Sequence, residues 1–132
     1  MLNISFFGAA QEVTGSCYLL EYETEKILID CGLFQAPKFC DERSFAEFPF
    51  DPKSVSAAFI THSHIDHIGR IPRLVAAGFQ GTIFSTHPTK SLSDLMLKDS
   101  MGVLQKEHPD KPIIYTEEDV AQAMTVWEGK NY

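Results

Sequence analysis

Four side chains of the kinds that bind metals lie close together in this sequence, and they constrain it more than any other feature. His62, His64, Asp66 and His67 follow directly after the apolar run AAFIT (57–61), which is typical of a buried strand. Side chains two residues apart on an extended segment point the same way, so His62 and His64 can converge on one ion. Asp66 and His67 come where the chain turns into a helix, so they can address a neighbouring point. Imidazole and carboxylate both suit zinc, and imidazole also suits iron or nickel. The pattern therefore predicts a metal site at the end of this strand.

Two other interpretations of the polar residues stay open at this point. The four could be polar residues of a surface turn, although four ligand-type side chains at this spacing rarely coincide. Asp30 ends the apolar run KILID (26–30) and is followed by Gly32. A carboxylate in that place either caps a hairpin or orients imidazoles that bind a metal, and spacing alone does not separate these two roles.

Apolar periodicity along the rest of the chain indicates strands first and then strands alternating with helices. We expect strands at 3–7, 17–22, 26–30, 57–61 and 82–86, and a short one at 111–116. Residues 31–54 read as a long loop with a helical turn near 42–46. A helix should follow the histidines and stop at Gly78, and another should begin at Pro88. This order predicts an α/β layered fold.

The two later helices carry more specific expectations. The helix at 88–100 should turn Leu92, Leu95 and Met96 inward. Thr116 and Asp119 resemble a capping box at the start of the last helix. The apolar face of that helix is then expected at Val120, Ala123, Met124 and Trp127.

Composition excludes several classes of protein. Eleven basic and eighteen acidic residues give a formal net charge of −7, which argues against a surface that binds phosphates everywhere. A local site in which metal ions supply the positive charge stays compatible with that charge. Apolar runs such as AAFI (57–60) fall far short of the about 20 residues of a membrane span. MLNISFF lacks the pattern of a signal peptide, and three cysteines are too few for a disulfide framework. We therefore expect a cytoplasmic protein with reduced thiols and no membrane partner, in which Cys31 is a small buried side chain.

Three segments resemble a known family. LIDCG (28–32) and ITHSHIDHIGRIP (60–72) resemble the first two motifs of the metallo-β-lactamase superfamily, and the opening FFGAAQEVTGSCYLLE (6–21) is similar to its β-CASP branch of RNA-processing nucleases. This resemblance implies an αββα sandwich with two zinc ions at the edge of its sheets. His62 and His64 would bind the first zinc ion, Asp66 and His67 the second, and Asp30 would support the cluster. A hydroxide bound to the metals would attack the scissile phosphodiester, and Asp66 would hold or accept its proton.

The resemblance also implies parts that residues 1–132 do not contain. The family uses a later histidine, a bridging aspartate, a last histidine and an inserted β-CASP domain. Four side chains do not close two sites, because a catalytic zinc ion alone takes three protein ligands. His87 and His108 are expected to be ordinary helix-end or surface histidines, with His87 capping the helix of Pro88. We therefore expect residues 1–132 to be the N-terminal part of a metallo-β-lactamase domain, inactive without the β-CASP insert and the C-terminal half.

The functional hypothesis is a zinc-dependent nuclease that cleaves RNA, with DNA as the alternative nucleic acid. A metallo-β-lactamase-fold hydrolase of thioesters or other small esters is the second hypothesis, because the same ligand motif serves both chemistries. A non-catalytic scaffold subunit is the third, although the complete set of four ligands counts against it. The loop aromatics are expected to pack on the sheet rather than to stack bases; they are Phe34, Phe39, Phe45, Phe48 and Phe50. A single sandwich half should expose an apolar sheet face and self-associate or be poorly stable.

Overall fold

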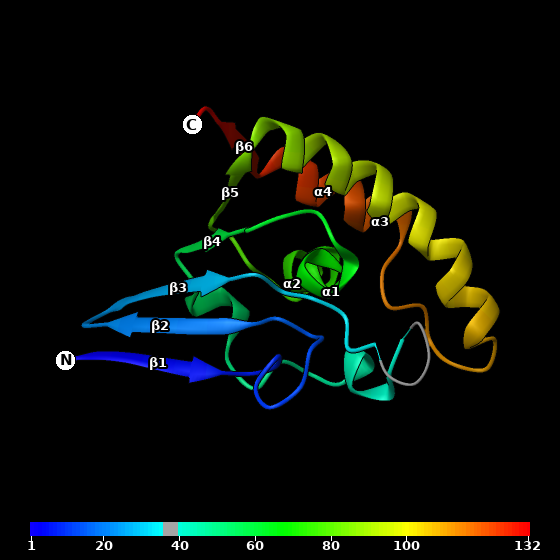
Figure 1. The fold of residues 1–132 in the computed structure, drawn as a ribbon, viewed down its shortest axis with the longest axis horizontal. Helices are drawn as coiled ribbons and strands as arrows, with labels where there is room; N and C mark the ends of the chain where they lie inside the picture. The colour runs from blue at the N-terminus through cyan, green and yellow to red at the C-terminus, as the bar shows by residue number, and fades with distance from the viewer. Residues whose placement is uncertain (36–39) are drawn as a thin grey trace.

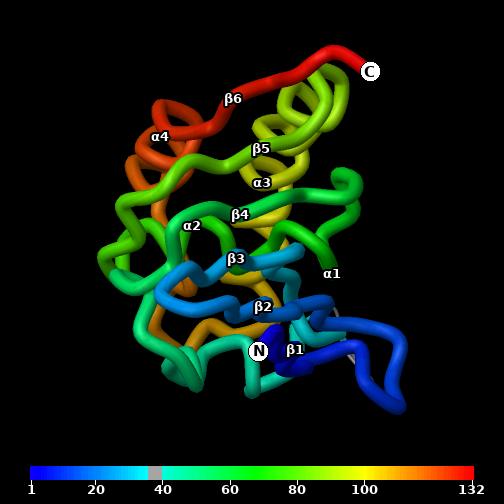
Figure 2. The backbone as a smooth tube through the Cα atoms, turned by 90° about the vertical axis from the view of Figure 1, so that its left-hand side faces the viewer, coloured from blue at the N-terminus to red at the C-terminus, as the bar shows by residue number. Residues whose placement is uncertain are grey.

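The computed structural model describes residues 1–35 and 40–132 and shows a six-stranded sheet whose strands follow chain order (Figure 2). The strands are β1 (Leu2–Phe6), β2 (Tyr18–Tyr22), β3 (Glu25–Ile29), β4 (Ala57–Phe59), β5 (Thr82–Thr86) and β6 (Trp127–Lys130). β1, β2 and β3 pair antiparallel, whereas β3, β4, β5 and β6 pair parallel. The expected α/β class and hairpin are confirmed. The strand expected at 111–116 is wrong, and β6 was not expected.

Helices cover one face of this sheet (Figure 1). They are α1 (Ile65–Ile68), α2 (Ile71–Ala76), α3 (His87–Glu107) and α4 (Glu117–Thr125). The single helix expected after the histidines is split into α1 and α2, and Pro72 lies in the first turn of the second. The helical turn expected near 42–46 is the 3₁₀ helix η1 (Glu42–Phe45), and η2 (Pro52–Ser54) follows it.

The core is built on one row of side chains that crosses the sheet. Leu28 pairs with Leu19 on one side and with Ala58 on the other, and Ala58 pairs through Ile83 to Trp127. All five side chains are buried. Because side chains alternate between the two faces of a strand, this row identifies the face that the helices cover.

The expected inward face of α3 is wrong in part. Leu92 is 51% exposed and Leu95 is 64% exposed, while Met96 is half-buried against the core. The buried positions of the helix are Ser93, Leu97, Ser100 and Leu104. Two of these are serines, so the hydrophobic pattern of the sequence predicts the wrong buried face for α3. Small side chains allow a helix to pack closely, and Ser100 satisfies its hydroxyl by donating to the Met96 carbonyl at 2.7 Å.

The last helix begins as expected and ends earlier than expected. The capping box of Thr116 and Asp119 is confirmed, with each side chain bonding the other residue's backbone N–H. α4 ends at Thr125, so the helical position expected for Trp127 is wrong. Trp127 begins β6 instead, and its indole N–H donates to Ser85 Oγ at 2.8 Å. Trp127 would be buried both on the apolar face of a helix and in a strand, so apolar periodicity alone could not distinguish the two.

The aromatic residues of the long loop pack as expected. Phe34 is buried, and Phe45, Phe48 and Phe50 pack against the core. The rings of Phe48 and Phe50 lie 5.4 Å apart. Phe39, and the part of the expected loop at 36–39, lie outside the described residues. Across residues 1–35 and 40–132, no helix has both the length and the apolar character needed to cross a membrane.

The second face of the sheet is apolar and exposed. Its central row runs from Phe6 through Tyr18, Ile29 and Phe59 to Phe84. Phe6 is 63% exposed and Phe59 is 45% exposed. Phe59 stacks on Phe84 with ring centroids 5.3 Å apart. Apolar surface of this kind favours association when nothing covers it.

We therefore expect the 132-residue chain to self-associate in a concentration-dependent way, as sedimentation velocity across a dilution series would show. Replacing Phe6 and Phe59 with serine should reduce this association, because both side chains lie on the exposed row. Val13→Ser is the matched control, since Val13 is 86% exposed and lies in the loop between β1 and β2. A monomer that unfolds cooperatively at every concentration would contradict the prediction.

Candidate metal centre

The predicted site residues lie at the carboxyl ends of two neighbouring parallel strands. Asp30 directly follows β3, and its backbone N–H donates to the Phe59 carbonyl at 2.9 Å, which extends the pairing with β4. Thr61 and His62 follow β4 after one intervening residue, and His64 is the N-cap of α1. Ligand sites of open α/β sheets form at this edge, because the loops that leave parallel strands meet there.

Backbone hydrogen bonds hold α1 against the segment after β3 and against Ser16, which precedes β2. Cys31 N donates to the His67 carbonyl at 2.8 Å, and Ser16 N donates to the Asp66 carbonyl at 2.9 Å. Gly32 lies between these contacts, and a Cβ atom built on it would lie within 1.6 Å of the Asp66 carbonyl oxygen. Glycine is required at this position because the two backbones approach so closely.

All four predicted ligand side chains gather in one cluster. The ring centroids of His62 and His67 lie 4.0 Å apart, and those of His62 and His64 lie 4.7 Å apart. His67 Nε2 lies 3.5 Å from Asp66 Oδ2. Partial burial, followed by the nearby His67 and His64, lowers the pKa of His62. The neutral imidazole that this favours is the form that binds metals.

Asp30 is buried and its carboxylate accepts hydrogen bonds from three residues. Thr61 N donates to Oδ1 at 2.8 Å, Ser16 Oγ donates to Oδ2 at 3.1 Å, and His67 Nδ1 lies 2.7 Å from Oδ2. The Thr61 hydroxyl lies 2.9 Å from Oδ2 as well. The Asp30 backbone has φ of 58°, a left-handed conformation that aspartate tolerates better than most residues. Asp30 therefore fixes the orientation of His67 directly and contacts His62 only through Thr61, and its role toward a metal stays a prediction.

The donor set fits part of a metal site. Neutral imidazole nitrogens and a carboxylate are ligands that zinc prefers, and His67 carries the carboxylate partner that ligand histidines usually have on their other nitrogen. Within the described ranges, no three His, Cys, Asp or Glu side chains converge closely enough to hold an ion. The cluster thus has the chemistry of a metal centre without enough converging donors to close one.

The other histidines and Cys31 have contacts elsewhere. His87 is the first residue of α3, and Thr86 rather than His87 caps the helix, which corrects the expectation for His87. His108 follows the end of α3, where its Nε2 lies 2.8 Å from the Cys40 carbonyl oxygen. Cys31 is fully buried, and burial raises the pKa of its thiol well above the ordinary value. It is therefore a packed side chain, as expected.

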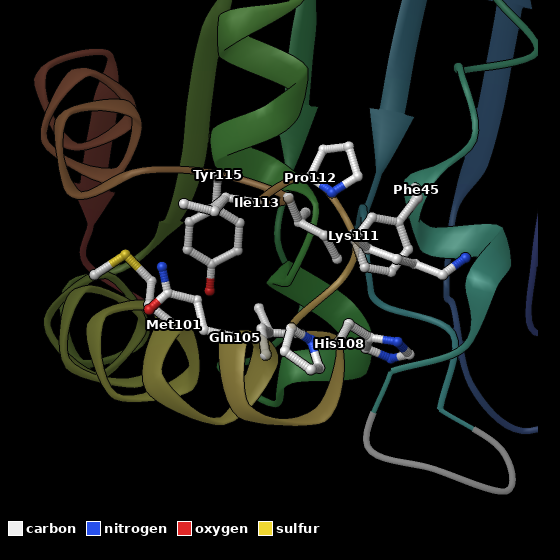
Figure 3. Close-up of a pocket in the computed structure, with 11 residues that line it drawn as sticks. Phe45, Met101, Gln105, His108, Lys111, Pro112, Ile113 and Tyr115 are labelled. Atoms are coloured by element: carbon white, nitrogen blue, oxygen red, sulfur yellow. The ribbon is translucent and has the colours of Figure 1, made fainter.

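A cavity of about 350 Å³ lies between the end of α3 and the segment that follows it (Figure 3). Phe45, His108, Lys111 and Tyr115 are among the residues that line it. None of the predicted ligands lines this cavity. The cluster of predicted metal ligands and this cavity therefore lie in separate parts of the molecule.

Sequence reasoning missed two residues that contact Asp30. Ser16 belongs to the opening segment that resembles the β-CASP branch, but its role depends on contact with a residue 14 positions away. Thr61 immediately precedes His62, and its hydroxyl contacts both Asp30 and His62. A hydroxyl residue directly before the first histidine was the available signal for Thr61.

Comparison with known proteins adds a family and several relatives. The family profile described as the metallo-beta-lactamase superfamily matches residues 10–130. Ribonuclease TTHA0252 of Thermus thermophilus is 42% identical over 93% of this chain and 27% of its own length. The transcription termination factor FttA of Methanocaldococcus jannaschii is 35% identical over 90% of this chain and 18% of its own. The cleavage and polyadenylation specificity factor 73 of Drosophila melanogaster is 32% identical over the whole chain and 19% of its own. The chain therefore spans less than a third of the length of each of these relatives.

Proposed function

Because the chain belongs to the metallo-β-lactamase superfamily, we propose that it is the N-terminal part of a metal-dependent nuclease of the β-CASP branch that cleaves RNA. The observation that carries this proposal is that His62, His64, Asp66 and His67 lie in one cluster at one sheet edge. The names of the matched relatives support it, since they include a ribonuclease and an mRNA cleavage factor. The family resemblance stated from the sequence is thereby confirmed, and the substrate is our inference.

Each residue of the cluster has a distinct proposed role. His62 and His64 would hold one zinc ion, and Asp66 with His67 would hold the second. Two bound zinc ions would supply a nucleophile from water at neutral pH and neutralise charge on the scissile phosphate. Asp66 would accept the proton that the attacking water loses, because its carboxylate lies beside the same nitrogen of His67 that would face the metal. Asp30 would act only through His67 and Thr61, because its buried side chain reaches no substrate.

The remaining ligands would come from outside residues 1–132. The exposed row from Phe6 to Phe84 is the face against which a second sheet would pack to make an αββα sandwich. That second half would supply the missing histidines and the bridging aspartate. The formal net charge of −7 repels RNA at long range, so basic surfaces that grip RNA would lie on an inserted or appended domain.

RNA cleavage by the full-length protein tests the function directly. We expect a labelled RNA to be cut in the presence of zinc, left intact after chelation with EDTA, and cut again when zinc is restored. A thioester substrate assayed in parallel separates the nuclease from a small-ester hydrolase that would use the same ligands. Hydrolysis of the thioester without cleavage of RNA or DNA would replace the proposal with that second function.

Zinc content of the 132-residue chain tests the ligand count. After dialysis against trace zinc, mass spectrometry of the metal should find well below two ions per chain, because a catalytic zinc ion takes three protein ligands and this cluster offers four donors for two ions. His64→Ala should lower the content further, whereas His87→Ala should leave it unchanged. A stoichiometry of two would show that the chain contains ligands beyond those assigned.

A further inference from the structure

The Thr61 hydroxyl lies between the buried carboxylate of Asp30 and the ring of His62. Its oxygen is 2.9 Å from Asp30 Oδ2 and 3.0 Å from His62 Nδ1. It is 3.4 Å from His67 Nδ1, which has a shorter contact of 2.7 Å with Asp30. One hydroxyl therefore touches both the anchor of the cluster and its first histidine.

The direction of these hydrogen bonds follows from the number of hydrogens available. An ionised carboxylate only accepts hydrogen bonds, and a hydroxyl has a single hydrogen to donate. If the Thr61 hydrogen pointed at His62, the Thr61 and Asp30 oxygens would face each other at 2.9 Å with no hydrogen between them. The Thr61 hydroxyl must therefore donate to Asp30, and it is left as an acceptor toward His62.

This direction determines the tautomer of His62. A hydroxyl that accepts from His62 Nδ1 requires the ring hydrogen to be on Nδ1, which leaves Nε2 with a free lone pair. His67 also carries hydrogen on Nδ1, for a separate reason, since this nitrogen donates directly to Asp30. Both rings thus turn a hydrogen-bearing nitrogen toward Asp30 and Thr61, and Nε2 of His62 keeps its lone pair, whereas Nε2 of His67 lies 3.5 Å from Asp66 Oδ2.

We propose that Thr61 is a positioning residue whose hydroxyl holds His62 in the Nδ1–H tautomer and so presents Nε2 as the free nitrogen of that ring. Free histidine in water favours the opposite tautomer, with the hydrogen on Nε2. The contact with Thr61 therefore reverses an intrinsic preference. The consequence of this tautomer rests on the proposed function, because a metal would bind His62 through its free nitrogen, Nε2. The tautomer itself is a property of the metal-free chain.

Nitrogen-15 NMR of the metal-free 132-residue chain tests this proposal. Long-range proton–nitrogen correlation spectra, recorded above the titration range of the imidazoles, distinguish the nitrogen that bears hydrogen from the one that does not. Single His→Gln variants assign the rings. In the wild type we expect His62 and His67 to carry hydrogen on Nδ1. In Thr61→Val, His62 should become predominantly Nε2–H, while His67 should stay Nδ1–H because Asp30 still accepts from it.

Two further variants separate positioning from structural damage. Thr61→Ser keeps the hydroxyl and should keep the wild-type tautomer of His62. Thr125→Val is the matched control, because its hydroxyl donates to the Gln122 carbonyl on α4, away from the cluster. A wild-type His62 that carries hydrogen on Nε2, or a His62 unchanged by Thr61→Val, overturns the proposal. If Thr61→Val does not fold, the wild-type and Thr61→Ser spectra decide it. Either result leaves the nuclease proposal to be judged by RNA cleavage.

Discussion

Replacing His62 and His64 together with alanine is expected to abolish RNA cleavage by the full-length protein, with the rate falling by roughly three orders of magnitude or more. In the proposed function, the two side chains would hold one of the two metal ions. The fold should survive, because His64 is exposed and His62 is only half-buried. Cleavage of a labelled RNA measures the loss, and circular dichroism measures the fold.

His87→Ala is the matched control for this double variant. His87 has the same chemistry and follows the neighbouring parallel strand β5, but it packs near Gly129 rather than in the cluster. We expect its substitution to leave cleavage close to the wild-type rate. Retained cleavage in the double variant, with zinc still required, would show that other residues hold the metal.

The second large effect is expected at Gly32. A methyl group there would meet the Asp66 carbonyl oxygen at 1.6 Å and the His67 nitrogen at 2.6 Å, both of them backbone atoms that cannot rotate away. Gly32→Ala should therefore lower the free energy of unfolding by about 2–4 kcal/mol, at the upper end of overpacking effects. It should also displace α1, which carries the proposed ligands Asp66 and His67, so that any zinc content of the chain falls with stability.

Gly102→Ala is the matched control for Gly32→Ala. Gly102 lies within α3, and a Cβ atom there would have open space around it. Alanine should stabilise the helix by about 0.5–1 kcal/mol, because glycine is the poorer helix former. Thermal unfolding of both variants at one protein concentration compares them. A Gly32→Ala chain as stable as the wild type would show that the two backbones are not held as closely as the structure shows.

Local chemistry explains why several elements could be predicted from the sequence. The bounds of β5 and the capping box of Thr116 and Asp119 depend on residues within a few positions of one another, and both are confirmed. The inward face of α3 depends instead on what the helix packs against. Leu92 and Leu95 are apolar and exposed, while Ser93 and Ser100 are polar and buried, so hydrophobicity along the chain pointed to the wrong face.

The sequence by itself determined the candidate ligand set, because His62, His64, Asp66 and His67 are neighbours in one strand-to-helix turn. Only the tertiary structure decided how they are oriented. Asp30 meets His67 across 37 residues because β3 and β4 pair in parallel and end at the same edge of the sheet. It meets Ser16 across 14 residues because β2 and β3 pair antiparallel. The spacing of residues along the chain predicts which side chains of one segment lie together. It does not predict hydrogen bonds between segments, because these depend on how the strands pair.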